Sequence, residues 1–255
     1  LLPIDELWLL KNANSRESIF SVQFSKEEDQ RNGHPAATSF HMARGWSDMY
    51  PELQFFNDFP EGPRKDATFV TDIPNRGFSG GAIITKNPPT IEWSVSQRFH
   101  PMYGKFTASE DLTVVGRTMG YRAIEIYRYA EVLLIYAEAK AASGGLDATA
   151  LSALNQVKRR AAGLDPNTPN ASVDVTTATV QDIIDEKGWE LAAEHKRWFD
   201  LVRTETLESA ILKRDPTEQV PLVRQPGKAQ YISPIPAEAI ATSKLDQNPQ
   251  GFKIQ

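Results

Sequence analysis

The sequence predicts a mainly α-helical fold in which antiparallel helix pairs carry a long loop-rich insertion and one or two short strands. Hydrophobic residues recur at helical spacing from about residue 121 to residue 210. Eight prolines interrupt residues 26–117, so we expect no helix there longer than a few turns. Residues 18–24 are rich in β-branched and aromatic side chains, which is typical of a strand.

Composition argues against several classes of protein. The chain of 255 residues has a formal net charge of −5 and a pI near 5.5. A nucleic-acid-binding protein presents a basic patch, whereas the longest basic run here is Lys158-Arg159-Arg160, so we expect no nucleic acid partner. No apolar stretch has the length needed to span a bilayer. The chain has no cysteine, so no disulfide framework is available.

The chain divides into two regions by its residue pattern. The loop-rich character ends near Gly120, after which the hydrophobic period becomes helical, so we separate residues 1–120 from residues 121–255. The chain opens on Leu1 rather than on an initiator methionine or a signal peptide, and residues 1–8 resemble the middle of an element. We therefore expect a fragment or a processed product of a longer protein.

The first long helix is predicted over residues 121–142. Its charged residues fall on one flank and nearly all the others are apolar or small, which predicts a largely buried helix. Gly144 and Gly145 end it, and Asp147 is placed to cap a second helix with a single apolar stripe. Two antiparallel helices joined by a short loop are the unit of helical-repeat architectures such as TPR.

A longer helical segment follows a polar loop that ends near residue 177. Thr179 and Asp182 have the spacing of a capping box at its start. Gly188 lies inside this helix, where glycine is unfavourable, so we expect another element to pack closely there. The predicted buried side is given by residues at helical spacing: Val180, Ile183, Ile184, Leu191, Trp198, Phe199 and Val202.

Four blocks in the second half of the chain resemble one known family in the order in which that family has them. They are residues 128–139 (RYAEVLLIYAEA), residues 155–161 (NQVKRRA), ELAAE at 190–194 with RWFDLVR at 197–203, and Pro234-Ile235-Pro236 with Gln247-Asn248-Pro249. Residues 18–24 are similar to the strand that precedes the loop region of the same family. The chain thereby resembles the C-terminal half of the SusD/RagB proteins, which are SusD-like outer-membrane nutrient-binding lipoproteins.

The resemblance implies a TPR-like helical scaffold with a ligand surface built from loops. It implies that residues 1–120 form a strand and a loop-rich, ligand-facing region, and that residues 121–255 form the helical SusD/RagB C-terminal region. Together the two regions are expected to form one domain of a longer protein. It implies non-catalytic binding of a glycan or another nutrient at the bacterial cell surface, for delivery to a SusC-like TonB-dependent transporter. Attachment to the outer membrane would use a lipid anchor that this chain lacks. The expected ligand is an oligosaccharide or polysaccharide, with a peptide as the alternative.

Aromatic residues in the loop-rich region are the candidates for ligand binding. Sugar rings stack their apolar C–H faces on Trp and Tyr, while amide and charged side chains bind the hydroxyl groups. The alternative role of each ring is to hold a loop against the scaffold. The candidate ligand-binding residues are three rings and three polar neighbours: Trp46, Tyr50, Trp93, Asp48, Arg64 and Asn75. The loop phenylalanines lack a polar tip and are assigned to packing: Phe55, Phe56, Phe78 and Phe99.

Catalysis and metal binding receive little support from the sequence. Glu186, Glu190 and Glu194 recur on one helix face, but a zinc-protease site needs a second histidine beside His195. There is no Gly-x-Ser-x-Gly motif and no cysteine nucleophile. We therefore predict a structural ion-pair network, with Arg128 buried within it and paired to Glu125, Glu131 or a carboxylate of the later helix. No catalytic residue, metal or cofactor is expected.

Three functions remain open on the residues alone. The first is capture of a glycan or nutrient without catalysis, which the resemblance favours. The second is a TPR-like protein-interaction module without a ligand of its own, whose partner is the transporter. The third is a glycoside-active enzyme, which would need two carboxylates on opposite sides of a cleft.

Overall fold

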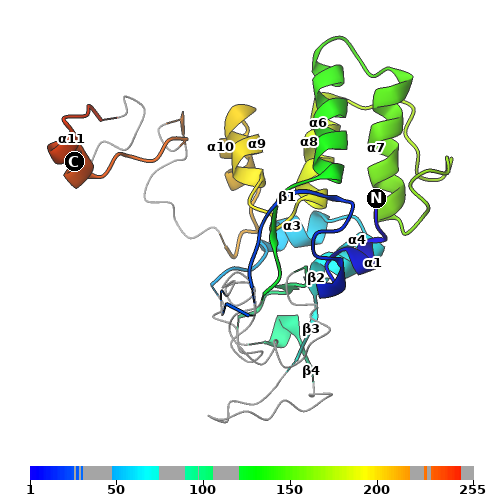
Figure 1. Ribbon diagram of the computed structural model, residues 1–255, viewed down its shortest axis with the longest axis horizontal. Coiled ribbons are helices and arrows are strands. Elements are labelled where there is room, and N and C mark those ends of the chain that lie inside the picture. The colour runs from blue at the N-terminus through cyan, green and yellow to red at the C-terminus, as the bar shows by residue number, and fades with distance from the viewer. Residues whose placement is uncertain are drawn as a thin grey trace.

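The computed structural model describes residues 1–255 apart from residues 26, 29, 31–47, 75–89, 97, 106–120, 219–226, 229–230 and 248–255. Its described part is mainly helical, which confirms the predicted fold class. Three long helices stand together at one end of the molecule, and the short strands and loops lie at the other (Figure 1). No helix among the described residues is long and apolar enough to cross a membrane.

The helical end is built by α6 (Tyr129–Ala142), α7 (Ala148–Ala161) and α8 (Val180–Glu190). α6 and α7 form the predicted antiparallel pair (Figure 1). The Asp147 side chain caps α7 by accepting a hydrogen bond from the Ala150 N–H at 2.8 Å. The predicted capping box at the start of α8 is also present. These local signals fix where α7 and α8 begin.

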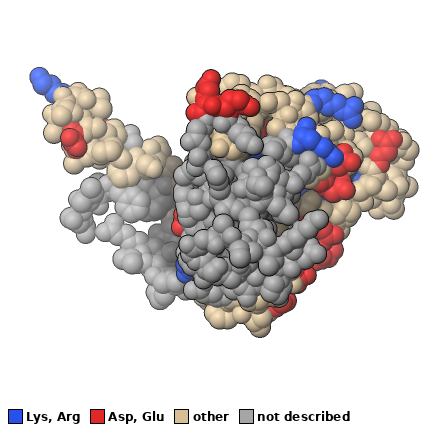
Figure 2. Space-filling view, turned by 60° about the horizontal axis from the view of Figure 1, so that its bottom comes forward, with Lys and Arg blue, Asp and Glu red and all other residues tan. Residues whose placement is uncertain are grey.

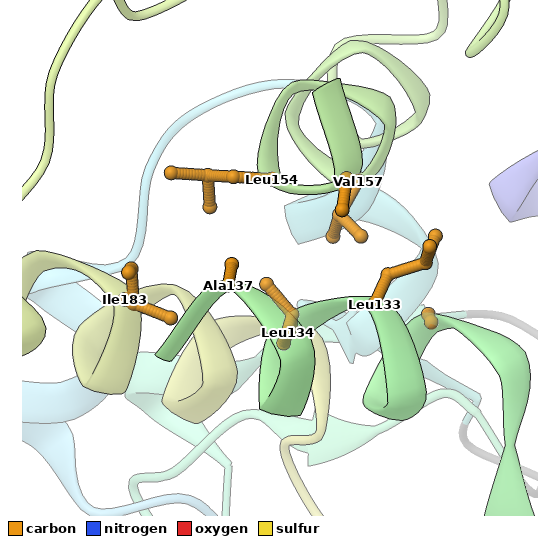
Figure 3. Packing of buried hydrophobic residues seen from close by; sticks show 8 residues of the cluster. Leu133, Leu134, Ala137, Leu154, Val157 and Ile183 are labelled. Carbon is orange, nitrogen blue, oxygen red and sulfur yellow. The ribbon is translucent and has the colours of Figure 1, made fainter. Parts of the chain in front are cut away.

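The main hydrophobic core lies between these three helices. Small and branched side chains of α6 point toward α7 and α8, which lets the helices approach closely (Figure 3). All of the labelled residues are at most 8% exposed. They come from α6, α7 and α8 in turn: Leu133, Leu134, Ala137, Leu154, Val157 and Ile183.

The predicted start of the first long helix is wrong. Residues Ile124–Arg128 form strand β6, which pairs antiparallel with β1 (Ser18–Val22), and the helix begins only at Tyr129. Val22 lies opposite Ile124 and Ser18 opposite Arg128. The β-branched Ile124 and Ile126 favour a strand. The partner strand is about a hundred residues away in the sequence, and the local spacing of hydrophobic residues cannot reveal a partner that remote.

The loop-rich end contains more strands than the one or two predicted. β2 (Phe69–Val70) pairs with β5 (Met102–Tyr103), and β3 (Asp72–Pro74) pairs with β4 (Thr90–Glu92). The described helices of this end are short, as the prolines predicted. They are α1 (Ile4–Leu7), α3 (Leu53–Asp58) and α4 (Pro63–Thr68), with 3₁₀ turns at Leu10–Asn12 and Trp93–Val95.

The longest predicted helix is divided in two, which corrects part of its predicted buried side. α8 ends at Glu190, and after a turn with positive φ at Ala193 (64°) and His195 (60°), α9 (Arg197–Arg203) begins. The turn changes the helical phase, so Trp198 and Phe199 are 47% and 68% exposed instead of buried.

The close approach expected at Gly188 is confirmed. A Cβ built there would lie 3.0 Å from Nη1 of Arg197. The same Nη1 donates a hydrogen bond to the Ile184 carbonyl at 3.0 Å, so α9 is tied to α8 through this arginine. α10 (Leu207–Leu212) follows α9, and α11 (Ala237–Ser243) lies apart from the other helices at the far left of Figure 1. The turn predicted near residues 248–252 lies outside the described residues.

Leu134→Ala is expected to lower the free energy of unfolding by about 2–5 kcal/mol, because it leaves a cavity between three helices. Val132→Ala, on the exposed side of the same helix, is the matched control and is expected to stay within about 0.5 kcal/mol of wild type. Urea unfolding of both variants measures the difference. Equal losses would show that the α6–α7–α8 interface is not the core.

Candidate functional site

A cluster of buried charges joins the loop-rich end to the helices. Glu190 of α8 lies at its centre and is fully buried. Its carboxylate pairs with Arg160 of α7, with Arg128 Nη1 at 2.6 Å and with Arg64 Nη1 at 3.3 Å. Burial alone would raise the pKa of Glu190, but these cations and Lys105 outweigh it and hold the pKa well below its usual range. Glu190 is therefore a charged structural group.

Glu194 extends this cluster in the turn after α8. Arg128 grips its carboxylate with two hydrogen bonds, from Nε at 2.6 Å and from Nη2 at 2.8 Å. Lys105 Nζ donates to Glu194 Oε1 at 2.9 Å and to the Glu190 carbonyl at 2.8 Å. Burial raises the pKa of the Glu194 carboxyl, yet Arg128 and Lys105 bring it below its ordinary value.

Two further carboxylates complete the cluster. Glu17, just before β1, accepts from Arg128 Nη1 at 3.0 Å and from the Leu2 N–H at 3.0 Å, while Glu186 accepts from Arg64 Nη1 at 2.6 Å. We call this set the charge cluster. It holds four carboxylates and four cations, all buried: Glu17, Glu186, Glu190, Glu194, Arg64, Lys105, Arg128 and Arg160.

The charge cluster confirms the predicted structural role of Arg128. Its partners are Glu17, Glu190 and Glu194 rather than Glu125 or Glu131. Trp8 packs at the edge of the cluster, with the cationic groups of three side chains within 6 Å of its ring. Among the described residues, no group of His, Asp or Glu side chains is arranged to hold a metal ion.

Arg64 lies inside the charge cluster, which corrects its place among the ligand candidates. It sits in the first turn of α4, and its side chain points to α8. The residue is buried and its guanidinium contacts Glu186 and Glu190, so it is not exposed to a ligand at the protein surface. Arg64 was selected because it lies near Tyr50 in the sequence, but its side chain pairs with the carboxylates of α8.

Tyr50 lies at the loop surface beside a cluster that the sequence did not reveal. Its ring is half-buried, with the ring centroid 4.9 Å from that of His100. His100 contacts the Glu218 carboxylate through Nε2 and the Arg98 carbonyl through Nδ1 at 2.6 Å. Asp48, two residues before Tyr50, is exposed.

Hydrogen bonds fasten the segment after α10 onto this surface. Glu218 Oε2 accepts from the Leu53 N–H at 3.3 Å, and Glu52 Oε1 accepts from the Asp215 N–H at 2.6 Å. Three segments that are remote in sequence therefore meet at Tyr50: residues 48–53, residues 98–100 and residues 214–218. We call this meeting point the Tyr50 surface.

Trp93 packs against the core of the loop region. Its ring lies 5.5 Å from Phe56 at an interplanar angle of 72°, and Phe56 packs in turn on Phe69. The backbone N–H of Trp93 donates a hydrogen bond to the Thr71 carbonyl at 2.9 Å. Trp93 is half-buried, so one part of it holds the loops together while another part reaches the surface.

Phe99 is a surface residue, which corrects its assignment to packing. It is 62% exposed and has a φ of 57°, a conformation that bulky residues rarely adopt. Phe55 and Phe56 are in the loop core as predicted. Trp46, Asn75 and Phe78 lie outside the described residues. On the face seen in Figure 2, the basic and acidic side chains of the described residues are scattered among other residues.

A model of the SusD family matches residues 78–250. The chain belongs to the SusD family. It is 27% identical to SusD-like protein P2 of Formosa agariphila over 216 residues, which covers 82% of this chain and 41% of that protein. The resemblance noted from four sequence blocks is thereby confirmed.

Solved structures agree with the SusD-family fold. A SusD superfamily protein from Parabacteroides distasonis has a TM-score of 0.70 and 25% identity to this chain, and the match covers 96% of this chain and 52% of that one. Surface glycan-binding protein A from Bacteroides fluxus has a TM-score of 0.68 and 25% identity, with coverages of 98% and 54%. The chain thus spans about half the length of the SusD-family proteins it matches.

Arg128→Met is expected to destabilise this SusD-family chain by about 3–5 kcal/mol, because it leaves buried carboxylates without their main cation. Lys140→Met is the control: it removes a cation that pairs with Asp147 on the surface, where pairing adds little stability. Thermal unfolding followed by circular dichroism measures both. An Arg128→Met variant that melts together with wild type would contradict the charge cluster.

Proposed function

We propose that this chain is the glycan-binding region of a non-catalytic surface protein and that it holds an oligosaccharide or polysaccharide at the Tyr50 surface. The observation that carries the proposal is membership of the SusD family together with 25% identity to a Bacteroides fluxus structure named as a surface glycan-binding protein. The residues around Tyr50 supply a chemistry that suits such a ligand.

The Tyr50 surface combines a ring with polar groups. A half-buried tyrosine offers one face of its ring to a sugar and keeps its hydroxyl for hydrogen bonding. Asp48, two residues before it in the sequence, is exposed, and its carboxylate can accept hydrogen bonds from sugar hydroxyls. Trp46 and Asn75, outside the described residues, stay in the proposed site with Trp93, whereas Arg64 is left out.

The surface is held in place before a ligand arrives. The ring of Tyr50 contacts His100, which is itself held by Glu218, and the N-terminus of α3 is capped by Glu52. In the loop core that follows Tyr50 in the sequence, Phe56 and Phe59 each pack edge to face on Phe69. A platform fixed in this way loses little conformational entropy on binding, which favours affinity.

The buried carboxylates support a binding protein over a glycoside-active enzyme. A glycosidase needs one carboxyl group with a raised pKa to act as the general acid. Glu190 and Glu194 instead have lowered pKa values, because arginines and Lys105 surround them. Glu190 is also fully buried inside the scaffold, and Glu194, although it lines a hollow beside β6, is held by Arg128 and Lys105.

The finer parts of the proposal rest on the family alone. They are the position at the bacterial cell surface, a lipid anchor to the outer membrane and delivery of the glycan to a SusC-like TonB-dependent transporter. The TPR-like interaction module without its own ligand is the second candidate. It predicts that the chain binds the transporter but no sugar.

Tyr50→Ala is expected to weaken glycan binding at least tenfold, because losing a central aromatic contact costs about 2 kcal/mol or more. Titration calorimetry of the wild-type chain against malto-, xylo-, manno-, cello- and laminari-oligosaccharides first identifies the ligand. Tyr136→Ala, a tyrosine on the surface of α6, is the matched control and should bind as wild type does. Chromatography of the incubated sugar should show no shorter products.

Three results would contradict the proposal in different ways. If no sugar binds, the interaction-module alternative gains support. Shortened products would indicate an enzyme. Unchanged affinity in Tyr50→Ala would place the glycan site away from the Tyr50 surface while leaving glycan binding intact.

A further inference from the structure

Phe99 combines an exposed ring with a strained backbone. Its side chain is 62% exposed, and its φ of 57° lies in the left-handed region, where the Cβ atom comes too close to the following carbonyl oxygen. A ring that is exposed to this degree gains little from burial that could offset the strain. Residues held in such conformations concentrate at binding sites and active sites, so Phe99 is a candidate for a functional contact.

The turn that carries Phe99 is fixed on both sides. Ser96 is buried and donates its backbone N–H to the Trp93 carbonyl at 3.0 Å. The backbone N–H of Phe99 then donates to the Ser96 carbonyl at 3.2 Å. On the other side, the next residue is His100, which is held by Glu218. These contacts keep the backbone of Phe99 in place while its ring stays in solvent.

Phe99 belongs to the Tyr50 surface. It directly precedes His100, whose ring centroid lies 4.9 Å from that of Tyr50. The Cα atoms of consecutive residues are about 3.8 Å apart, so Phe99 and Tyr50 lie in the same small part of the surface. The phenylalanine side chain has no hydrogen-bonding group and offers a ligand only an apolar face. The C–H face of a sugar is a partner of that kind.

The charged groups of the Tyr50 surface are mainly acidic. Its three segments hold four carboxylates and two guanidinium groups, so the carboxylates outnumber the cations even when His100 is protonated. Like charges that meet across an interface are unfavourable, so this balance disfavours an anionic glycan and favours an uncharged one. The groups are Asp48, Glu52, Asp215 and Glu218 on the acidic side and Arg98 and Arg214 on the basic side.

We propose that Phe99 is a second sugar-contacting residue of the Tyr50 surface and that the ligand is an uncharged oligosaccharide that spans Tyr50 and Phe99. Tyr50 stacks on one sugar unit and Phe99 on another unit of the same chain. The strained backbone serves to hold the Phe99 ring toward the ligand, at some expense of stability. This inference rests on the proposed glycan-binding function and adds a contact residue and the class of glycan.

Phe99→Gly separates ligand contact from packing, because glycine removes the ring and adopts a positive φ without strain. We expect the melting temperature to rise by about 2–4 °C. In titration calorimetry, the affinity for the tightest-binding hexasaccharide of the malto-, xylo-, manno-, cello- and laminari-series should fall at least tenfold. A lower melting temperature would identify a packing residue and overturn the proposal, and so would unchanged affinity.

Lys244→Gly is the matched control for the relief of strain. Lys244 has a φ of 52° at the C-terminus of α11, which is remote from α3 (Figure 1). The variant should therefore raise the melting temperature and bind the hexasaccharide as wild type does. Two further variants test the ring itself. Phe99→Asn, which tolerates a positive φ, should bind as weakly as Phe99→Gly, whereas Phe99→Tyr should retain wild-type affinity. Wild-type affinity in Phe99→Asn would overturn the contact.

The failure of this inference is distinct from the failure of the proposed function. If Tyr50→Ala weakens binding of the hexasaccharide and the Phe99 variants bind as wild type does, glycan binding stands and the second contact is overturned. That result would favour a protein partner for the exposed ring. If no sugar binds, the proposed function and this inference both fail.

An anionic probe tests the class of glycan. Oligogalacturonate of six units carries one carboxylate on each sugar and should bind the wild-type chain at least tenfold more weakly than the tightest-binding neutral hexasaccharide. Equal or tighter binding of the oligogalacturonate would overturn the assignment of an uncharged ligand while leaving glycan binding intact.

Discussion

Four buried carboxylates and four buried cations meet where the loop-rich end of the molecule joins its helices. Each of these charges would be strongly unfavourable away from water on its own, and the cost is offset only when all of them find partners. Glu190 alone contacts arginines from α4, β6 and α7. The charge cluster therefore requires several elements, remote in sequence, to occupy their places together.

This requirement connects the scaffold with the surface proposed to bind a glycan. Arg64 and Lys105 belong to the loop-rich end, and both reach into the cluster from segments next to the loop core. The loop core then supports Trp93 and the start of α3, beside which Tyr50 lies. A loop surface held in this way can present a ring in one orientation, although loops as a class are mobile.

Local signals in the sequence predicted much of the scaffold. The caps at Asp147 and Thr179, the α6–α7 pair and the burial of Arg128 depend on residues close in sequence or on strong periodicity, and each is present. Strand β6 was mistaken for helix because its partner β1 is remote in sequence. Trp198 was wrongly assigned to the core. A turn at residues 191–196 changes the helical phase, and hydrophobic periodicity alone does not reveal such a turn.

The candidate site was harder to predict than the scaffold. Arg64 was chosen because it is near aromatic residues in sequence, but the direction of its side chain depends on α8. Phe99 was assigned to packing because its side chain has no polar group. In a loop, the absence of a polar group does not predict whether a side chain is buried. The contact of Tyr50 with His100, and of His100 with Glu218, joins segments that no local pattern relates.

Hydrogen–deuterium exchange of the Glu190→Gln variant tests most directly whether the charge cluster holds the loops on the helices. The substitution keeps the shape of the side chain and removes its charge. Our account predicts faster exchange in α8 and also in residues 64–70 and 102–105, because Arg64 pairs with the Glu190 carboxylate and the charge of Lys105 is attracted to it. Faster exchange confined to α8, with the loop segments unchanged, would contradict the account.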